Sequence, residues 1–243
     1  MATDRLDAVV FDWGGTLAEF AAIELADMWR LAAHHLDPAR EDELTRQLCQ
    51  AEADMWARVK TTQESSTLAQ LIAAASTAVG LDVGEAVMEE AAVRHLDAWT
   101  PHVVHEPDAA PVLEALRERG LRTALLSNTH WPRAFHERFL ARDGLDVLLD
   151  ARLYSSELSH LKPHPSVFLA TLEAIGVDDP TTAVFVGDRP VDDVSGAKRV
   201  GMRAVHRRNP GLPEADQHGP VTADATIDNL RELVPIVDGW LDG

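Results

Sequence analysis

The chain is organised around one stretch, Ala8-Val9-Val10-Phe11-Asp12-Trp13-Gly14-Gly15-Thr16-Leu17. Its apolar opening, led by β-branched residues, predicts a buried strand over residues 7–12 that ends at one carboxylate, Asp12. The two glycines that follow let the backbone turn sharply and approach a bound group closely. Open α/β sheets bind ligands beyond the carboxyl ends of their strands, so Asp12 is a candidate functional residue. An Asp that only begins a turn would look the same in this stretch alone.

The composition is that of a globular protein with a strong acidic excess. The 243 residues are 46% hydrophobic and 26% charged, which allows a sizeable core. The formal net charge of −18 argues against binding to nucleic acids and to anionic membrane surfaces, because both need basic residues. An anionic substrate would need a local cation in the site of so acidic a chain.

The sequence also indicates a compartment. The single cysteine, Cys49, excludes an internal disulfide bond and is expected to be a small buried side chain. No apolar run reaches the ~18 residues of a membrane span, and the N-terminus lacks the pattern of a secretory signal. We therefore expect a cytoplasmic protein, whose oligomeric state stays open.

From about residue 21 to residue 99 the pattern is helical. The segment is rich in Ala, Leu, Glu and Gln, and its apolar residues recur at helical spacing, as in Leu25, Met28 and Trp29. Breaks fall at Asp37-Pro38, at 61–66 and at 80–84. The segment therefore predicts roughly four helices in a small all-α unit.

From Asp108 onward, helical and strand patterns alternate. The expected helices are 109–119, 132–141, 165–175, 191–200 and 230–240, and the expected strands are 123–126, 147–149, 183–186, 203–205 and 225–227. This alternation predicts a parallel sheet with right-handed crossovers. The expected fold class is therefore α/β, with a parallel sheet sandwiched by helices and with the all-α unit inserted after its first strand.

Polar residues follow several of these strands or begin the helices between them. They are Ser127 and Asn128, Lys162-Pro163, and Asp188 with Asp192 and Asp193. In a parallel sheet they would meet at the edge where Asp12 lies. Carboxylates at short range repel one another unless a cation lies between them, and carboxylate oxygens suit Mg²⁺. Each residue taken alone could also be a turn, a helix cap or a surface ion pair.

As a set, these stretches resemble four motifs of the haloacid dehalogenase-like (HAD) hydrolase superfamily, over nearly the whole chain. The matching stretches are Phe11–Leu17, Leu126-Ser127-Asn128, Leu161-Lys162-Pro163, and Val186-Gly187-Asp188 with Asp193. The resemblance implies a Rossmann-like catalytic core at residues 1–19 and 100–243. It also implies a helical cap at residues 20–99, inserted between the first and second motifs.

The resemblance implies a phosphatase that acts on a small phosphorylated metabolite. Asp12 would attack phosphorus and form an aspartyl-phosphate, which splits one difficult displacement into two easier ones. Ser127 and Lys162 would bind the phosphoryl oxygens. Further substrate contacts are expected from Asn128, Gly15 and Thr16.

The resemblance also implies a Mg²⁺ site. Asp12, Asp188 and the backbone carbonyl of Gly14 would hold the ion, which lets a carboxylate approach a phosphate dianion. Asp193 is expected to orient the metal or its waters, with Asp192 as the alternative for this role.

Position 14 departs from the family pattern. Family phosphatases usually carry a second Asp two residues after the nucleophile, which protonates the leaving oxygen and later activates water. Gly14 cannot transfer a proton, and general acid–base catalysis typically contributes about 10²–10⁴-fold. An alkyl alkoxide should therefore leave slowly, and the covalent intermediate should persist.

Three interpretations stay open. The first is a phosphatase whose leaving group is weakly basic or which uses a stand-in acid, His130 or Glu19. The second is a phosphonate or other non-ester hydrolase of the same fold. Its first motif is similar, but its Schiff-base lysine would have to be Lys60, whose surroundings differ. The third is a catalytically weak protein that binds a phosphorylated ligand or a partner. The metal-free dehalogenase branch is disfavoured by the intact Gly187-Asp188.

Overall fold

The computed structural model of the chain describes residues 5–19, 23–212, 214, 217–219 and 221–242. At its centre lies a six-stranded sheet in the order β3-β2-β1-β4-β5-β6, with every neighbouring pair parallel. The strands are β1 (Ala8–Phe11), β2 (Arg122–Ser127), β3 (Ala151–Tyr154), β4 (Ala183–Gly187), β5 (Arg203–Arg207) and β6 (Ala225–Ile227). The expected α/β class with a parallel, Rossmann-like sheet is confirmed.

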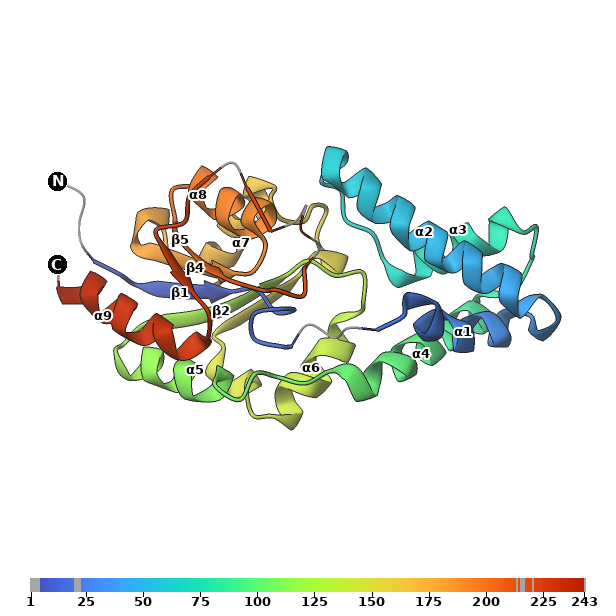
Figure 1. Cartoon of the computed structure of the whole chain (residues 1–243), viewed down its shortest axis with the longest axis horizontal. Coiled ribbons are helices and arrows are strands. Elements are labelled where there is room, and N and C mark those ends of the chain that lie inside the picture. Colours follow the sequence, from blue (N-terminus) through green and yellow to red (C-terminus); the bar gives the residue numbers. More distant parts are fainter. Residues whose placement is uncertain (1–4, 20–22, 213, 215–216, 220, 243) are drawn as a thin grey trace.

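Helices cover both faces of this sheet. They are α5 (Ala109–Glu118), α6 (Arg133–Arg142), α7 (Pro165–Ala174), α8 (Gly196–Arg199) and α9 (Leu233–Asp242). Figure 1 shows α5 and α9 on one face of the sheet and α7 and α8 on the other. In β1, Val9 and Phe11 pack on the first side, whereas Ala8 and Val10 pack on the second. The strand is therefore apolar on both faces because helices bury both of them. We call the sheet with α5–α9 the sheet unit.

Four further α-helices lie in the described residues between β1 and α5. These insertion helices are α1 (Leu25–Leu36), α2 (Glu41–Thr62), α3 (Leu68–Ala78) and α4 (Glu85–Trp99). They share an apolar core of their own that includes Trp29, Leu48 and Ile72, with Cys49 half-buried beside it. Figure 1 shows them as a separate group beyond one end of the sheet.

Local signals in the sequence explain where the insertion helices begin and end. The Asp37 side chain accepts a hydrogen bond from the Ala39 N–H at 3.0 Å and so begins a short 3₁₀ turn after α1. Thr67 and Gln70 form a capping box at the start of α3, which satisfies two backbone N–H groups there. The breaks expected near residues 37, 61–66 and 80–84 are all present between the helices.

The strand expected at residues 147–149 is wrong. Residues Asp146–Leu148 form a 3₁₀ helix, and the strand follows as β3. Val147 is 73% exposed and only Leu149 beyond it is buried, so the apolar run contains no strand. The strand β3 was not predicted because it lies at the edge of the sheet and lacks a continuous apolar run. Its Arg152 forms an ion pair with Glu137. Short apolar runs do not distinguish a strand from a turn of helix.

The helix expected over residues 191–200 is in two parts. Residues Pro190–Ser195 form a π-helical turn, and α8 continues it for four residues. Such turns with their wider hydrogen-bond spacing often occur at functional sites. The last helix is likewise preceded by a 3₁₀ turn at Leu230–Glu232.

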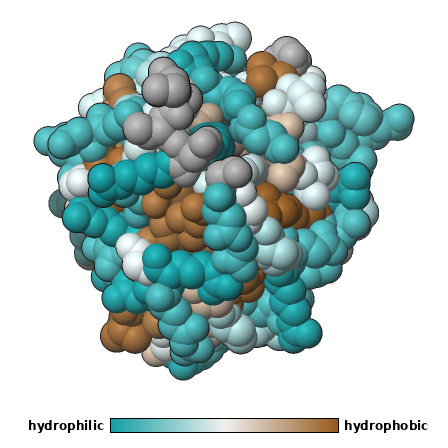
Figure 2. Space-filling view, turned by 90° about the vertical axis from the view of Figure 1, so that its left-hand side faces the viewer, coloured by the Kyte–Doolittle hydropathy of each residue, from teal (hydrophilic) through white to brown (hydrophobic). Residues whose placement is uncertain are grey.

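No helix in the described ranges is both long enough and apolar enough to cross a bilayer. Figure 2 looks onto the end of the sheet unit that lies away from the insertion helices, and hydrophilic residues cover most of this face. This agrees with the acidic composition of the chain.

Candidate active site

An ion pair joins two side chains that lie 150 residues apart in the sequence. The Nζ of Lys162 lies 2.5 Å from Oδ1 of Asp12 and 2.7 Å from Oδ1 of Asp193. Asp12 directly follows β1, which is hydrogen-bonded to both β2 and β4 in the middle of the sheet. This is the crevice at the carboxyl ends of the strands in which open α/β sheets bind ligands.

Three carboxylates surround the same point. Oxygens of Asp12, Asp188 and Asp193 all lie within 4.8 Å of one another, and all three residues are buried. Asp188 follows β4, and Asp193 lies in the π-helical turn. The Lys162 ammonium group and the nearby Arg189 guanidinium do not balance three carboxylates, so this cluster keeps an excess of negative charge that favours a further cation.

The pKa values of these groups reflect the excess charge. Burial raises the pKa of Asp12 to about 7, and the nearby carboxylates of Asp193 and Asp188 add to this effect while Lys162 opposes it. Burial and the carboxylate of Asp193 raise the pKa of Asp188 to about 6. Burial alone would lower the pKa of Lys162, but Asp12 and Asp193 outweigh it and raise this pKa. The ammonium group is therefore charged at neutral pH.

Two side chains beyond the sequence prediction hold Asp188. Nδ2 of Asn209 donates to Oδ2 of Asp188 at 2.7 Å, and the ring of His206 lies 3.2 Å from its backbone oxygen. Oδ1 of Asp188 is buried and has no hydrogen-bond partner among the described residues. The sequence analysis missed His206 near the end of β5 and Asn209 after it, although the strand-end position that identified Asp12 applies equally to that strand.

Asp193, and not Asp192, belongs to the cluster of three. Its Oδ2 accepts a hydrogen bond from the Arg189 N–H at 2.9 Å. The Asp192 side chain is half-buried, and burial beside Asp193 raises its pKa to about 6.

Asn128 is bound to the backbone of Lys162. Its Nδ2 donates to the Lys162 oxygen at 2.9 Å, and its Oδ1 accepts from the Lys162 N–H at 2.8 Å. The geometry therefore makes Asn128 a residue that positions Lys162, and its expected contact with substrate stays a prediction. Ser127 is buried at the end of β2, beside β1.

The loop after Asp12 is a tight turn. The N–H of Gly15 donates to the Ala18 oxygen at 2.8 Å, and the N–H of Thr16 donates to the Trp13 oxygen at 3.2 Å. These two amides are thus used within the turn, so their expected contact with substrate also stays a prediction. The Thr16 hydroxyl is buried and lacks a partner among the described residues.

The two glycines of this loop are not equivalent. Gly15 has a φ of +78°, and a Cβ there would lie 2.1 Å from Oδ2 of Asp188, so only glycine fits. A Cβ on Gly14 would meet nothing within 4 Å. Open space therefore lies at the position where the family's second Asp would stand.

The other sequence candidates are scattered. Glu19 is exposed, and its N–H donates to the Val104 oxygen at 2.9 Å. Lys60 is exposed near the end of α2. His130 is buried beneath the insertion helices, beside Glu52.

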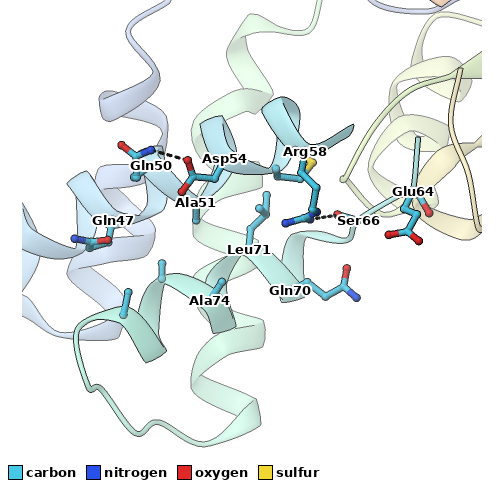
Figure 3. A pocket seen from close by; sticks show the side chains of 14 residues that line it. Gln47, Gln50, Ala51, Asp54, Arg58, Glu64, Ser66, Gln70, Leu71 and Ala74 are labelled. Carbon is cyan, nitrogen blue, oxygen red and sulfur yellow. Dashed lines mark hydrogen bonds between the residues drawn. The ribbon is translucent and has the colours of Figure 1, made fainter. Parts of the chain in front are cut away.

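A groove of about 610 Å³ lies between α2 and α3. Figure 3 shows that insertion-helix side chains line it, with Gln50 hydrogen-bonded to Asp54 and Arg58 to Ser66. None of the lining residues belongs to the acidic cluster, so this groove is not the site described above.

Comparison with known proteins supports an enzyme site. A family model described as haloacid dehalogenase-like hydrolase matches residues 6–201. A glyceraldehyde 3-phosphate phosphatase of Methanopyrus kandleri is 30% identical over 164 residues, which cover 65% of this chain and 67% of that protein. An N-acetylmuramic acid 6-phosphate phosphatase of Pseudomonas aeruginosa is 27% identical over 240 residues, 96% of each chain. Several other curated relatives align over less than a third of their own length.

Solved structures similar to this chain include dehalogenases as well as phosphatases. A protein described as a dehalogenase superposes with a TM-score of 0.61 at 25% sequence identity, and the match covers 96% of this chain and 98% of that one. A HAD phosphatase from Thermococcus onnurineus superposes with a TM-score of 0.62 at 29% sequence identity, and the match covers 96% of this chain and 99% of that one. The similarity therefore includes the insertion helices as well as the sheet unit.

Proposed function

The chain belongs to the haloacid dehalogenase-like hydrolase family, and from that premise we propose that it is a Mg²⁺-dependent phosphatase that forms an aspartyl-phosphate at Asp12. Its substrate would be a small phosphorylated metabolite, as the names of the phosphatase relatives suggest. We further propose that residues 20–99 act as a cap over a catalytic core made of residues 1–19 and 100–243. The contact of Lys162 with both Asp12 and Asp193 is the observation that carries the proposal.

The acidic cluster suits Mg²⁺. Three carboxylates converge, and Oδ1 of Asp188 is buried without a partner among the described residues, which costs free energy unless a cation or water meets it. Asp12, Asp188 and the carbonyl of Gly14 would bind the ion, and Asp193 would orient it. Bound there, Mg²⁺ supplies the positive charge that lets a carboxylate approach a phosphate dianion.

The protein's own groups account for the remaining steps. A carboxylate oxygen of Asp12 bonds to phosphorus while the bond from phosphorus to the ester oxygen breaks, and that oxygen leaves with the electron pair. Water then attacks the aspartyl-phosphate, which releases phosphate and restores Asp12. Lys162 and Ser127 stabilise the charge on the phosphoryl oxygens.

Gly14 determines which leaving groups depart readily. No side chain stands at this position to protonate the ester oxygen, and space is open there. We therefore propose that efficient substrates have a weakly basic leaving group. Lys60 is exposed near the end of α2, so no observation favours a Schiff-base phosphonate hydrolase.

Hydrolysis of an aryl phosphate tests the proposal. The wild-type protein should turn over p-nitrophenyl phosphate in the presence of Mg²⁺, and EDTA or the Asp12→Asn variant should reduce the rate by at least ~10³-fold. Equal rates in all three samples would refute it.

A further inference from the structure

Glu52 and His130 face each other across the boundary between the insertion helices and the sheet unit. Oε1 of Glu52, on α2, lies 3.9 Å from Nε2 of His130, which lies between β2 and α6. Both residues are buried. The distance is too long for a hydrogen bond, so the two groups approach each other without bonding directly.

His130 has no hydrogen-bond partner for either ring nitrogen among the described residues. Burial lowers the pKa of His130, against the opposing charge of Glu52, so the ring is neutral at pH 7 and presents one donor and one acceptor. A buried polar group without a partner costs roughly 1–3 kcal/mol. Such groups persist mainly where a ligand or water meets them.

Each of the four insertion helices contributes a residue that contacts His130 or Glu52. Rings of Trp56 on α2 and His95 on α4 lie 6.1 and 6.3 Å from the ring of His130. The indole N–H of Trp29 on α1 donates to Oε2 of Glu52 at 2.7 Å, which fixes the carboxylate and leaves Oε1 available. At the start of α3, the Leu68 N–H donates to the His130 backbone oxygen at 2.8 Å. The pair is therefore held in place from both sides of the boundary.

The pair also lies near the proposed phosphoryl site. His130 follows Ser127 by three residues, so their Cα atoms are at most about 11 Å apart. The organic part of a small phosphate ester bound at Ser127 and Lys162 would extend from there toward the insertion helices.

We propose that Glu52 and His130 form a subsite that binds a hydroxyl group of the substrate's organic part. A hydroxyl donates to a carboxylate and accepts from an imidazole N–H, and one oxygen can reach both groups across 3.9 Å. A second anionic group is excluded because the Glu52 carboxylate repels it. The substrate class is therefore the phosphate esters whose organic part carries a hydroxyl group, such as those of polyols or sugars. This inference rests on the proposed function, because it assumes that phosphate binds at Asp12 and Lys162.

Calorimetric titration of the Asp12→Asn protein with Mg²⁺ tests the subsite without turnover. Glycerol 3-phosphate should bind at least about tenfold more tightly than propyl phosphate, which lacks the hydroxyls. In His130→Phe, the ratio of the affinities for glycerol 3-phosphate and propyl phosphate should fall to about one. In Glu52→Gln this ratio should fall to a few-fold, because a neutral amide accepts a weaker hydrogen bond than a carboxylate does. Asp54→Asn, an exposed charge change on the same helix, should leave the ratio unchanged.

Thermal unfolding separates this role from a structural one. Because both nitrogens of His130 lack partners, His130→Phe should unfold at the wild-type temperature or higher. A fall of more than about 5 °C would assign His130 to cap docking and overturn the subsite.

Other outcomes of the calorimetric titrations would also overturn the proposed subsite. An unchanged ratio in His130→Phe, or tighter binding of 3-aminopropyl phosphate than of glycerol 3-phosphate, would also overturn the inference. If inorganic phosphate binds but the hydroxyl preference is missing, the subsite alone fails. If inorganic phosphate does not bind to the wild-type protein in the presence of Mg²⁺ either, the proposed function fails with it.

Discussion

A single ammonium group, that of Lys162, lies among three buried carboxylates at the carboxyl ends of the central strands. The 2.5 Å contact with Asp12 orients one oxygen of this carboxylate and keeps part of its negative charge balanced. Burial raises the pKa of Asp12 to about 7, and the nearby carboxylates of Asp193 and Asp188 add to this effect. A site with these properties favours a divalent cation, because the cation binds the ionised carboxylates that burial disfavours.

This charge balance predicts a pH-dependent effect of Mg²⁺ on stability. The folded-state pKa values of Asp12 and Asp188 are raised, so without metal the free energy of unfolding falls as pH rises from about 4 to about 7. Mg²⁺ removes this penalty by binding the ionised forms. The gain in melting temperature on adding Mg²⁺ should be larger at about pH 8 than at about pH 5. The Asp188→Asn variant should lose most of this gain, and an equal gain at both pH values would contradict the prediction.

The open space at Gly14 predicts a gain of function. A Cβ there meets no atom within 4 Å, so Gly14→Asp should fold and place a carboxylate beside the leaving oxygen. Turnover of alkyl phosphates should rise by about 10²-fold, as expected for general acid–base catalysis. Steady-state kinetics with an alkyl phosphate would measure this rise.

Gly15→Ala is the matched control for that variant. Its Cβ would clash with the Asp188 carboxylate, so Mg²⁺ binding and turnover should both fall. Suppose that a Gly14→Asp protein folds and binds Mg²⁺ yet hydrolyses alkyl phosphates no faster than the wild type. That result would contradict the claim that the missing side chain at position 14 slows the departure of alkyl leaving groups.

Sequence reasoning identified the residues that meet in the site, because strand ends in a parallel sheet share an edge. Asp12, Lys162, Asp188 and Asp193 lie together as the strand-end argument expects, while their roles stay predictions. Asn209 and the pairing of Glu52 with His130 were not predicted from the sequence. Glu52 and His130 approach each other only after the insertion helices dock, and no local pattern in the sequence encodes that docking.

At the scale of elements, the segment between α2 and α3 joins the insertion helices to the sheet unit. The Ser65 N–H donates to the Ser159 oxygen at 3.2 Å, and the Leu161 N–H donates to the Gln63 oxygen at 3.2 Å. These bonds flank an antiparallel bridge between Glu64 and His160. The segment is therefore bonded to the residues that directly precede Lys162.

The capping box at the start of α3 predicts a measurable contribution to stability. Thr67→Ala removes the side-chain acceptor of the Gln70 N–H, and should lower the free energy of unfolding by about 1 kcal/mol in urea denaturation. Thr77→Ala on the same helix is the control. Thr77 is exposed and bonds only its own helix, so a comparable loss there would show that capping is not the cause.

The elements that the sequence predicted well are those with long periodic patterns. The breaks between the insertion helices contain residues that favour helix ends, such as Asp37-Pro38 and the glycines near residue 80. The failure at residues 147–149 concerns a short apolar run, for which neighbouring structure decides between strand and turn. The π-helical turn at Pro190–Ser195 also had no local signal.

For the molecule as a whole, the proposed reaction requires the insertion helices to move. The proposed binding groups are all buried in this arrangement, namely Lys162, Ser127, Glu52 and His130. Under the proposed function, substrate entry therefore needs the insertion helices to open, as lids do in many enzymes. The sequence predicted the split of the sheet unit around the helical insertion, because the first strand precedes the helical pattern. The domain bounds and the cytoplasmic location stay predictions.

A cross-link between the two units tests this movement. Glu64 and His160 form a bridge whose flanking bonds are of the widely spaced type, which brings Cα atoms to about 4.5 Å and within disulfide range. On oxidation, the turnover of the double variant Glu64→Cys/His160→Cys should fall by about tenfold or more. The reason is that a cross-link that holds the insertion helices in place slows substrate entry and product release. A reductant should restore the rate.

The reduced double variant and each single variant are the controls. They should keep near-wild-type turnover under both conditions. Full activity of the oxidised, cross-linked protein would contradict the requirement for opening.

The central claim is that Asp12 bonds to phosphorus during turnover. Because Gly14 leaves the second step without a general base, the aspartyl-phosphate should accumulate. Rapid acid quenching of wild-type protein with p-nitrophenyl phosphate and Mg²⁺, followed by peptide mass spectrometry, should find one phosphoryl group on Asp12 and none in Asp12→Asn. Turnover without any phosphoryl group on Asp12, or with the group on another residue, would contradict the account.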